Sequence, residues 1–258
     1  MIENQNKDFS VYRPILYFNG KNYKFTNFQL LTFIIGAPLL SVFTYYFLQL
    51  KINYWVYEFI STQIRPNAAL IVFPFEDDYS FGILQSSFHW EWFKARCSTL
   101  TERFRYTSNT VFDSFPWPQW GNLNSLENSI KNIKKKDRKI ELAINVASSA
   151  RELRNIRNKI KKEFNYSLRE IYRTLELPGK NLLRDAQNNL DNAVLKAYNY
   201  GLPKKMQKND PLEFLLELNL SCANVEKNDL KIIGPGLPKF CEGKTVFYSD
   251  DCIKLNKY

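Results

Sequence analysis

The feature that most constrains the fold is a long run, residues 125–165, that contains neither glycine nor proline. It is rich in lysine, arginine, glutamate, leucine and alanine, which favour the α-helix. Apolar side chains recur within it at intervals of three and four residues, from Ile140 to Ile160. That spacing places them along one side of a helix. The run therefore predicts a long amphipathic helix.

Further helices are expected after this run. Residues 167–177 begin with Ser167 and Glu170, which stand in the register of a capping box. Residues 185–198 and 211–220 also carry apolar side chains at helical spacing. We therefore expect a helical C-terminal domain over residues 121–220, followed by a tail, residues 221–258, that has little periodicity.

The segment before this domain, residues 54–120, mixes strand and helix patterns. Residues 54–60 and 69–75 are β-branched and aromatic and predict two strands. Residues 81–96 carry apolar side chains at helical spacing and predict one helix, with Ser80 as its N-cap. Residues 97–120 read as a loop that includes the extended Phe-Pro-Trp-Pro sequence. The expected fold class is α+β, a mixed segment followed by a mainly α-helical domain.

The N-terminal segment, residues 1–53, is atypical. Residues 25–50 carry no charged side chain and are largely apolar. A run of this length is enough to span a bilayer, and the alternative is an aromatic-rich core segment. Both interpretations stay open at this point.

Charge is concentrated in the middle of the chain. The formal net charge is +10, and residues 91–173 hold 18 basic and 9 acidic side chains, whereas the parts before and after are close to neutral. A concentrated positive charge indicates an anionic partner, either nucleic acid or a membrane surface.

Two groups of side chains are candidates for contacts with DNA phosphates and base edges. The first lies at the end of the 81–96 helix and in the loop after it: Lys94, Arg96, Arg103, Arg105, Tyr106, Thr107 and Asn109. The second, Arg151, Arg154 and Arg157, steps by three along one face of the long helix. The alternative for the second group is a solvated face balanced by neighbouring glutamates.

Catalytic and metal-binding patterns are missing from the sequence. His89 is the one histidine, so a site with several histidine ligands is excluded. The four cysteines contain no Cys-x-x-Cys pair and read as reduced thiols of a cytoplasmic protein. No nucleotide-binding glycine motif precedes a helix. We therefore predict neither catalytic residues nor a metal site in this chain.

Several long segments resemble the MmeI-like DNA methyltransferases, which are large fused type II restriction–modification enzymes. Residues 70–119 (LIVFPFEDDYSFGILQSSFHWEWFKARCSTLTERFRYTSNTVFDSFPWPQ) are similar to the end of their target-recognition domain. Residues 150–198 resemble their C-terminal helical domain, and residues 232–240 and 247–253 resemble their closing tail. The resemblance implies that the chain contacts double-stranded DNA and helps to select the sequence that is methylated.

The sequence also departs from that family. It lacks the Asn-Pro-Pro-aromatic motif that orients a flipped adenine, and it lacks the glycine-rich loop for S-adenosylmethionine. Residues 1–53 do not match the family, which suggests a truncated or frameshifted reading frame and argues against a membrane anchor. The resemblance thus implies the DNA-binding part of an N6-adenine methyltransferase that has no cofactor of its own, either a remnant or a specificity part that needs a separate catalytic subunit. The rival hypothesis is a membrane-tethered basic helical protein that binds anionic lipid or nucleic acid.

Overall fold

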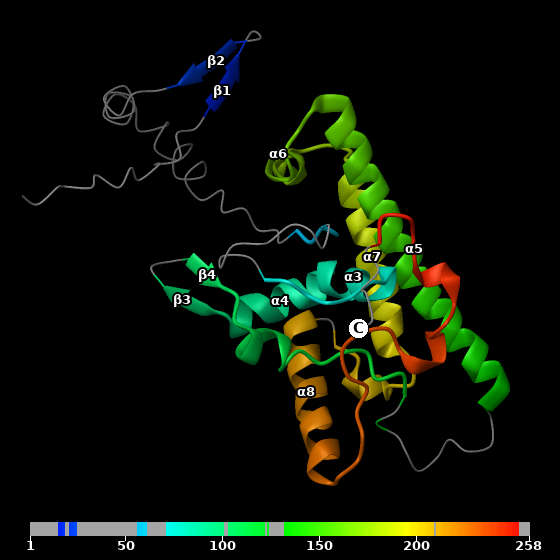
Figure 1. The fold of residues 1–258 in the computed structure, drawn as a ribbon. Coiled ribbons are helices and arrows are strands. Elements are labelled where there is room, and N and C mark those ends of the chain that lie inside the picture. The colour runs from blue at the N-terminus through cyan, green and yellow to red at the C-terminus, as the bar shows by residue number, and fades with distance from the viewer. Residues whose placement is uncertain are drawn as a thin grey trace, which may run out of the picture. The chain divides into compact units, whose positions relative to one another are not determined.

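The structure is a computed structural model that describes residues 15–18, 21–24, 56–60, 71–100, 103–121, 123, 132–208 and 210–252 (Figure 1). The chain divides into two compact units, Met1–Asn53 and Tyr54–Tyr258. In the first unit, β1 (Ile15–Phe18) pairs antiparallel with β2 (Lys21–Lys24), and Ile15 lies opposite Lys24. The whole apolar run 25–50 falls outside the described residues. No helix in the described ranges is long and apolar enough to cross a membrane.

The second unit opens with two consecutive helices where the sequence predicted one. Helix α3 (Asp78–Gln85) and helix α4 (Ser87–Arg96) are separated by Ser86, whose backbone is extended. The Ser86 hydroxyl donates a hydrogen bond to the Ile83 carbonyl, 2.7 Å away, and so competes with the helix ladder. The N-cap of α3 is Asp77 rather than Ser80, whose amide donates to the Asp77 carboxylate at 2.7 Å. A break of one residue leaves the spacing of the apolar side chains almost unchanged, so the sequence pattern predicted a single continuous helix.

The two strands expected at residues 54–60 and 69–75 are wrong for the described residues, because 56–60 and 71–75 have no regular structure. Their backbone bonds to side chains instead. The Tyr57 amide donates to Gln85 at 3.0 Å, and the Tyr57 carbonyl accepts from Arg157 at 2.9 Å. The aromatic side chains that suggested strands, among them Phe59 and Phe73, pack against the core.

A β-hairpin lies where the sequence predicted a loop. Strand β3 (Ser98–Leu100) pairs antiparallel with β4 (Arg103–Arg105), and a π-turn, η1 (Ser108–Phe112), follows. The strands in the described part of the chain are confined to this hairpin and to β1–β2. The described residues are therefore mainly α-helical, as expected for the C-terminal part, while the mixed α+β character expected for the chain is not shown by them.

The long helix predicted from the glycine-free run is present as α5 (Asn132–Phe164). Its partners are α6 (Leu168–Arg173), α7 (Leu182–Asn199) and α8 (Pro211–Lys227), joined by short 3-10 turns. The predicted capping box of Ser167 and Glu170 at α6 is confirmed. Figure 1 shows α7 running back alongside α5, and α8 packs on α4.

The core forms where α3 lies against α5. Small side chains of α5, among them Ala147 and Ala150, are fully buried there. A Cβ atom on Gly82 of α3 would lie 2.8 Å from Val146 Cγ1 and 3.2 Å from Ala150 Cβ. Glycine at position 82 therefore lets the two helices approach closely. The same core takes in aromatic residues from both sides of residue 120, while the boundaries expected at residues 120 and 220 stay predictions.

Candidate nucleic-acid interface

Strand β4 of the β3–β4 hairpin contains two residues of the first candidate group, Arg103 and Arg105. The register pairs Ser98 with Arg105 and Leu100 with Arg103. Phe104 lies against α4, with its ring centre 5.8 Å from that of Phe93, while Arg105 next to it is exposed. Successive residues of a strand point to opposite faces. The hairpin thus packs on α4 through one face and presents Arg105 on the other.

The last turn of α4 adds two exposed cations. The Lys94 ammonium lies 2.7 Å from the Glu91 carboxylate and 5.7 Å from the centre of the Trp90 ring. The Arg96 guanidinium lies 5.7 Å from the centre of the Trp92 ring. Basic side chains at this end also complement the helix dipole. Lys94 and Arg96 are two residues apart, so they point to different sides of α4, and both are exposed at the end from which the hairpin starts.

The π-turn η1 presents small polar side chains. Asn109 is exposed and accepts a hydrogen bond from the Ser108 hydroxyl at 3.0 Å, and Thr107 is hydrogen-bonded to Thr110. Val111 anchors the turn: it is fully buried, and its carbonyl accepts from the Trp92 indole at 3.1 Å. The arrangement holds an amide and hydroxyl groups at the surface on a fixed backbone.

Tyr106 does not belong to this surface. Its side chain is 6% exposed, its hydroxyl lies 3.1 Å from His89 Nε2, and its ring stacks on Phe93. A ring in this position is not available to stack on a base, which corrects the expectation for Tyr106. Its role is to fasten the end of β4 to α4.

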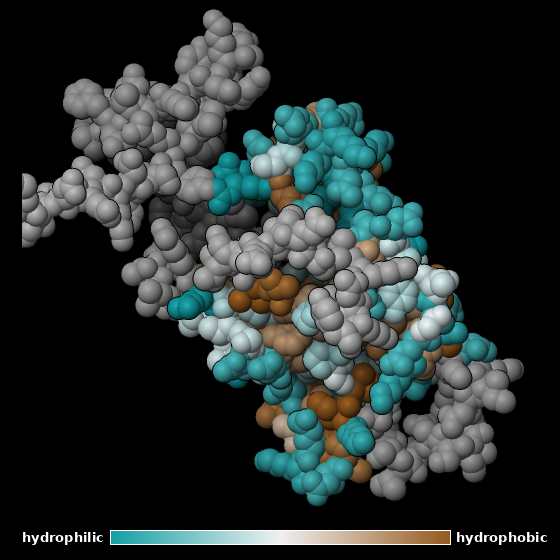
Figure 2. All heavy atoms as spheres, in the orientation of Figure 1, coloured by the Kyte–Doolittle hydropathy of each residue, from teal (hydrophilic) through white to brown (hydrophobic). Residues whose placement is uncertain are grey.

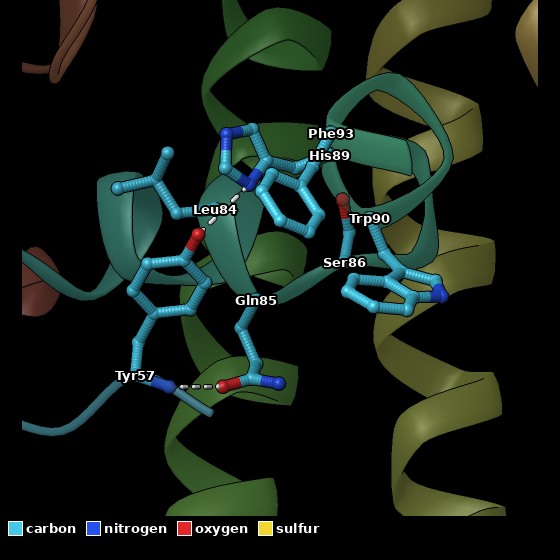
Figure 3. A pocket seen from close by; sticks show the side chains of 7 residues that line it. All are labelled: Tyr57, Leu84, Gln85, Ser86, His89, Trp90 and Phe93. Carbon is cyan, nitrogen blue, oxygen red and sulfur yellow. Dashed lines mark hydrogen bonds between the residues drawn. The ribbon is translucent and has the colours of Figure 1, made fainter. Parts of the chain in front are cut away.

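His89 joins this anchor to the segment before α3. Its Nδ1 atom lies 3.0 Å from the Tyr57 hydroxyl (Figure 3). Burial lowers the pKa of His89 to about 3, so the ring is neutral at physiological pH and offers one donor and one acceptor. One tyrosine hydroxyl therefore donates to the ring and the other accepts from it. Burial also raises the pKa of Tyr106, which keeps that hydroxyl protonated.

The second group of candidate residues lies along one face of α5, but that face is packed. Arg154 and Arg157 are 2% and 1% exposed, and Arg157 donates to the Tyr57 carbonyl. Arg151 is one-third exposed and is bound to Asp78 at 2.7 Å. Buried guanidinium groups do not reach a phosphate backbone, which corrects the expectation for Arg154 and Arg157. The sequence did contain an indication of this burial, because Arg154 and Arg157 stand one helical turn after the apolar Ala150 and Leu153.

The arginines of α5 converge on Asp78 at the start of α3. Arg151 and Arg154 both bind its carboxylate, and Ser249 from the C-terminal tail donates to it at 2.9 Å. Arg154 also binds the tail through Asp251, with Nε 2.7 Å from Oδ2. The hydrogen bond from Arg154 lowers the pKa of Asp251 to about 2.

Asp78, Asp251 and Cys252 lie close enough to share a metal ion. The guanidinium groups of Arg151 and Arg154 already neutralise these carboxylates, so the cluster is an ion-pair hub that ties tail, α3 and α5 together. The four cysteines are free thiols.

Comparison with known proteins supports the resemblance of residues 51–119 to a target-recognition domain. No curated protein sequence matches this chain. Among solved structures, the type IIL restriction–modification enzyme MmeI in complex with DNA matches over 57% of this chain and 16% of its own, with 23% sequence identity and a TM-score of 0.40. The chain thus corresponds to a small part of that enzyme's length. The family model "MmeI, target recognition domain" matches residues 51–119, so this segment is similar to the target recognition domains of that family.

Proposed function

We propose that the surface formed by the end of α4, the β3–β4 hairpin and η1 contacts double-stranded DNA and contributes to the choice of its target sequence. The observation that carries this proposal is the coincidence of two features. The match to a target recognition domain covers residues 51–119, and the same segment exposes the cations Lys94, Arg96 and Arg105 beside the polar residues Thr107 and Asn109.

The chemistry of these side chains suits two different tasks. Lys94, Arg96 and Arg105 carry positive charges that bind phosphate oxygens and fix the protein on the duplex. Arg103, which the hairpin register places opposite Leu100, extends that group. The amide of Asn109 and the hydroxyl of Thr107 are groups that read base edges. The rigid aromatic packing beneath them holds their spacing constant.

We further propose that this segment serves an N6-adenine DNA methyltransferase of a restriction–modification system, acting in the cytoplasm. Methyl transfer then takes place on a separate catalytic domain or subunit that binds S-adenosylmethionine. The enclosed cavity beside His89, lined by Tyr57, Gln85 and Trp90 among others, has a volume of about 10 Å³ and admits no more than a water molecule (Figure 3).

The test is duplex DNA binding by the full chain, measured by fluorescence anisotropy over a series of salt concentrations. Wild-type affinity should fall steeply with salt, because each neutralised phosphate releases counterions. Charge reversal in R103E/R105E should weaken binding by at least tenfold at low salt. K204E/K205E is the matched control, since it makes the same change of charge at two exposed lysines on the turn after α7.

Circular dichroism and thermal unfolding establish that each variant is folded before its affinity is compared. Equal losses in R103E/R105E and K204E/K205E would mean that net charge alone attracts DNA, which contradicts the proposed surface. A competitor series with duplexes of different sequence then tests target selection.

A further inference from the structure

The basic residues near the end of α5 are divided between two opposite faces. Arg154 and Arg157 point into the core, whereas Lys159 and Lys162 are exposed. At about 100° per residue, Lys159 and Lys162 fall within one side of the helix together with exposed Asn155. Positive charge on this outer side is therefore not required by the packing of the helix.

Five neighbouring side chains of this outer side border one open space at the surface. They are Asn155, Asn158, Lys159, Lys162 and Glu163. Two ammonium groups and two side-chain amides thus face one space, with a single carboxylate among them. Such a set of donors fits anionic oxygen atoms.

Lys159 and Lys162 are not engaged elsewhere in the part of the chain that the structure describes. Lys161, between them in sequence, lies 3.6 Å from the Glu58 carboxylate. No ion pair or side-chain hydrogen bond to another described residue is formed by Lys159 or Lys162. Their charges are available for a ligand.

Two exposed aromatic rings lie at the end of α5. Phe164 and Tyr166 are 54% and 39% exposed, and their rings are stacked with centres 5.5 Å apart. Figure 2 shows that the surrounding end of the molecule, where α5 turns into α6, is otherwise mainly hydrophilic. Phe164 follows Lys162 by about 200° around the helix, so the aromatic pair is not part of the outer side that carries the two lysines.

We propose that Lys159 and Lys162, flanked by Asn155 and Asn158, form a second contact with the phosphate backbone of duplex DNA. This inference rests on the proposed function of the hairpin surface and extends it to a separate element. The backbone presents closely spaced phosphate oxygens, which match the ammonium and amide donors of this side of the helix. Lys159 and Lys162 are about 4.5 Å apart along the helix axis, close to the spacing of about 3.4 Å between charges on one DNA strand.

The salt dependence of binding measures this contact directly. Each phosphate contact contributes about 0.9 to the slope of log K against log salt for duplex DNA. The double variant K159E/K162E should therefore reduce the magnitude of the slope by about 2 and lower the affinity at low salt. K204E/K205E, with the same change in charge, should leave the slope within about 0.5 of the wild-type value. A phosphate contact without base readout also predicts the same loss on every duplex sequence.

The experiment compares four full-length proteins on the same fluorescent duplex: wild type, K159E/K162E, R103E/R105E and K204E/K205E. If the wild type fails to bind the duplex, both the proposed function and the proposed second contact are wrong. If the wild type binds, R103E/R105E weakens it, and K159E/K162E matches the control, the second contact alone is wrong. Co-sedimentation with phosphatidylserine vesicles forms the last arm, because loss of vesicle binding without loss of DNA binding in K159E/K162E would assign this surface to lipid and overturn the inference.

Discussion

The guanidinium of Arg154 and the carboxylate of Asp78 form an ion pair in the protein interior, with side-chain exposures of 2% and 0%. The pair joins α5 to the first turn of α3, and Arg154 extends to Asp251 of the tail. Its guanidinium also lies 4.6 Å from the centre of the Phe81 ring and 5.0 Å from that of Phe59. Arg154, whose position in the sequence suggested a contact with DNA, thus links α5, α3 and the C-terminal tail.

Replacing Arg154 should test this link. Arg154→Met keeps much of the volume but leaves Asp78 buried with Arg151 as its remaining cation, so the free energy of unfolding should fall by about 3–5 kcal/mol. The control is Arg138→Met, which removes a surface pair with Glu141 whose partners are more than half exposed, and should cost about 1 kcal/mol or less. Urea denaturation followed by circular dichroism measures both, and equal costs would contradict a central role for Arg154.

The buried imidazole of His89 predicts a pH dependence of stability. The unfolded chain binds a proton at His89 near pH 6.5, whereas the folded chain binds it near pH 3. Between these values the unfolded state holds more protons, so stability is present above pH 6.5 and is lost as the pH falls. Between pH 7 and pH 5 this group should remove about 2 kcal/mol from the free energy of unfolding. A wild-type profile as flat as that of His89→Gln over this interval would refute the assignment.

The close approach of α3 to α5 depends on Gly82. Gly82→Ala would gain up to about 1 kcal/mol of helix propensity, but the new methyl group would clash with Val146 and press on Ala150. Overpacking typically costs about 1–3 kcal/mol, so we expect the melting temperature to fall by several degrees. Gly234→Ala is the control, because a Cβ atom there meets nothing within 4 Å. Thermal unfolding of both variants decides the point.

Tyr106 and Arg105 are neighbours in sequence that should behave oppositely. Tyr106→Phe removes the hydrogen bond to His89 and should lower stability by about 1 kcal/mol, while DNA affinity of the folded protein should stay within twofold of wild type. Arg105→Ala should weaken DNA binding and leave stability within about 0.5 kcal/mol. Anisotropy titrations and urea denaturation of both variants provide the comparison. If Tyr106→Phe is fully folded and still loses DNA affinity, Tyr106 contributes to the DNA interface and the prediction is wrong.

The helices of the second half could be predicted from the sequence because their signals are local. The run without glycine or proline predicted α5, and Ser167 with Glu170 predicted the start of α6. The segment before them was harder to predict. Residues 56–60 and 71–75 have strand-like composition. The backbone of Tyr57, however, bonds to the side chains of Gln85 and Arg157, and no local sequence pattern predicts such long-range partners.

The candidate site shows the same division. The sequence by itself determined that positive charge gathers in residues 91–173 and that the segment around Arg105 carries the groups suited to DNA. Tertiary structure alone decided which of these side chains are exposed: Arg105 and Asn109 face outward, while Tyr106, Arg154 and Arg157 are buried. The physical reason is that charge and spacing are properties of the chain, whereas burial depends on distant groups, here Asp78, His89 and Tyr57, that reach these residues only after folding.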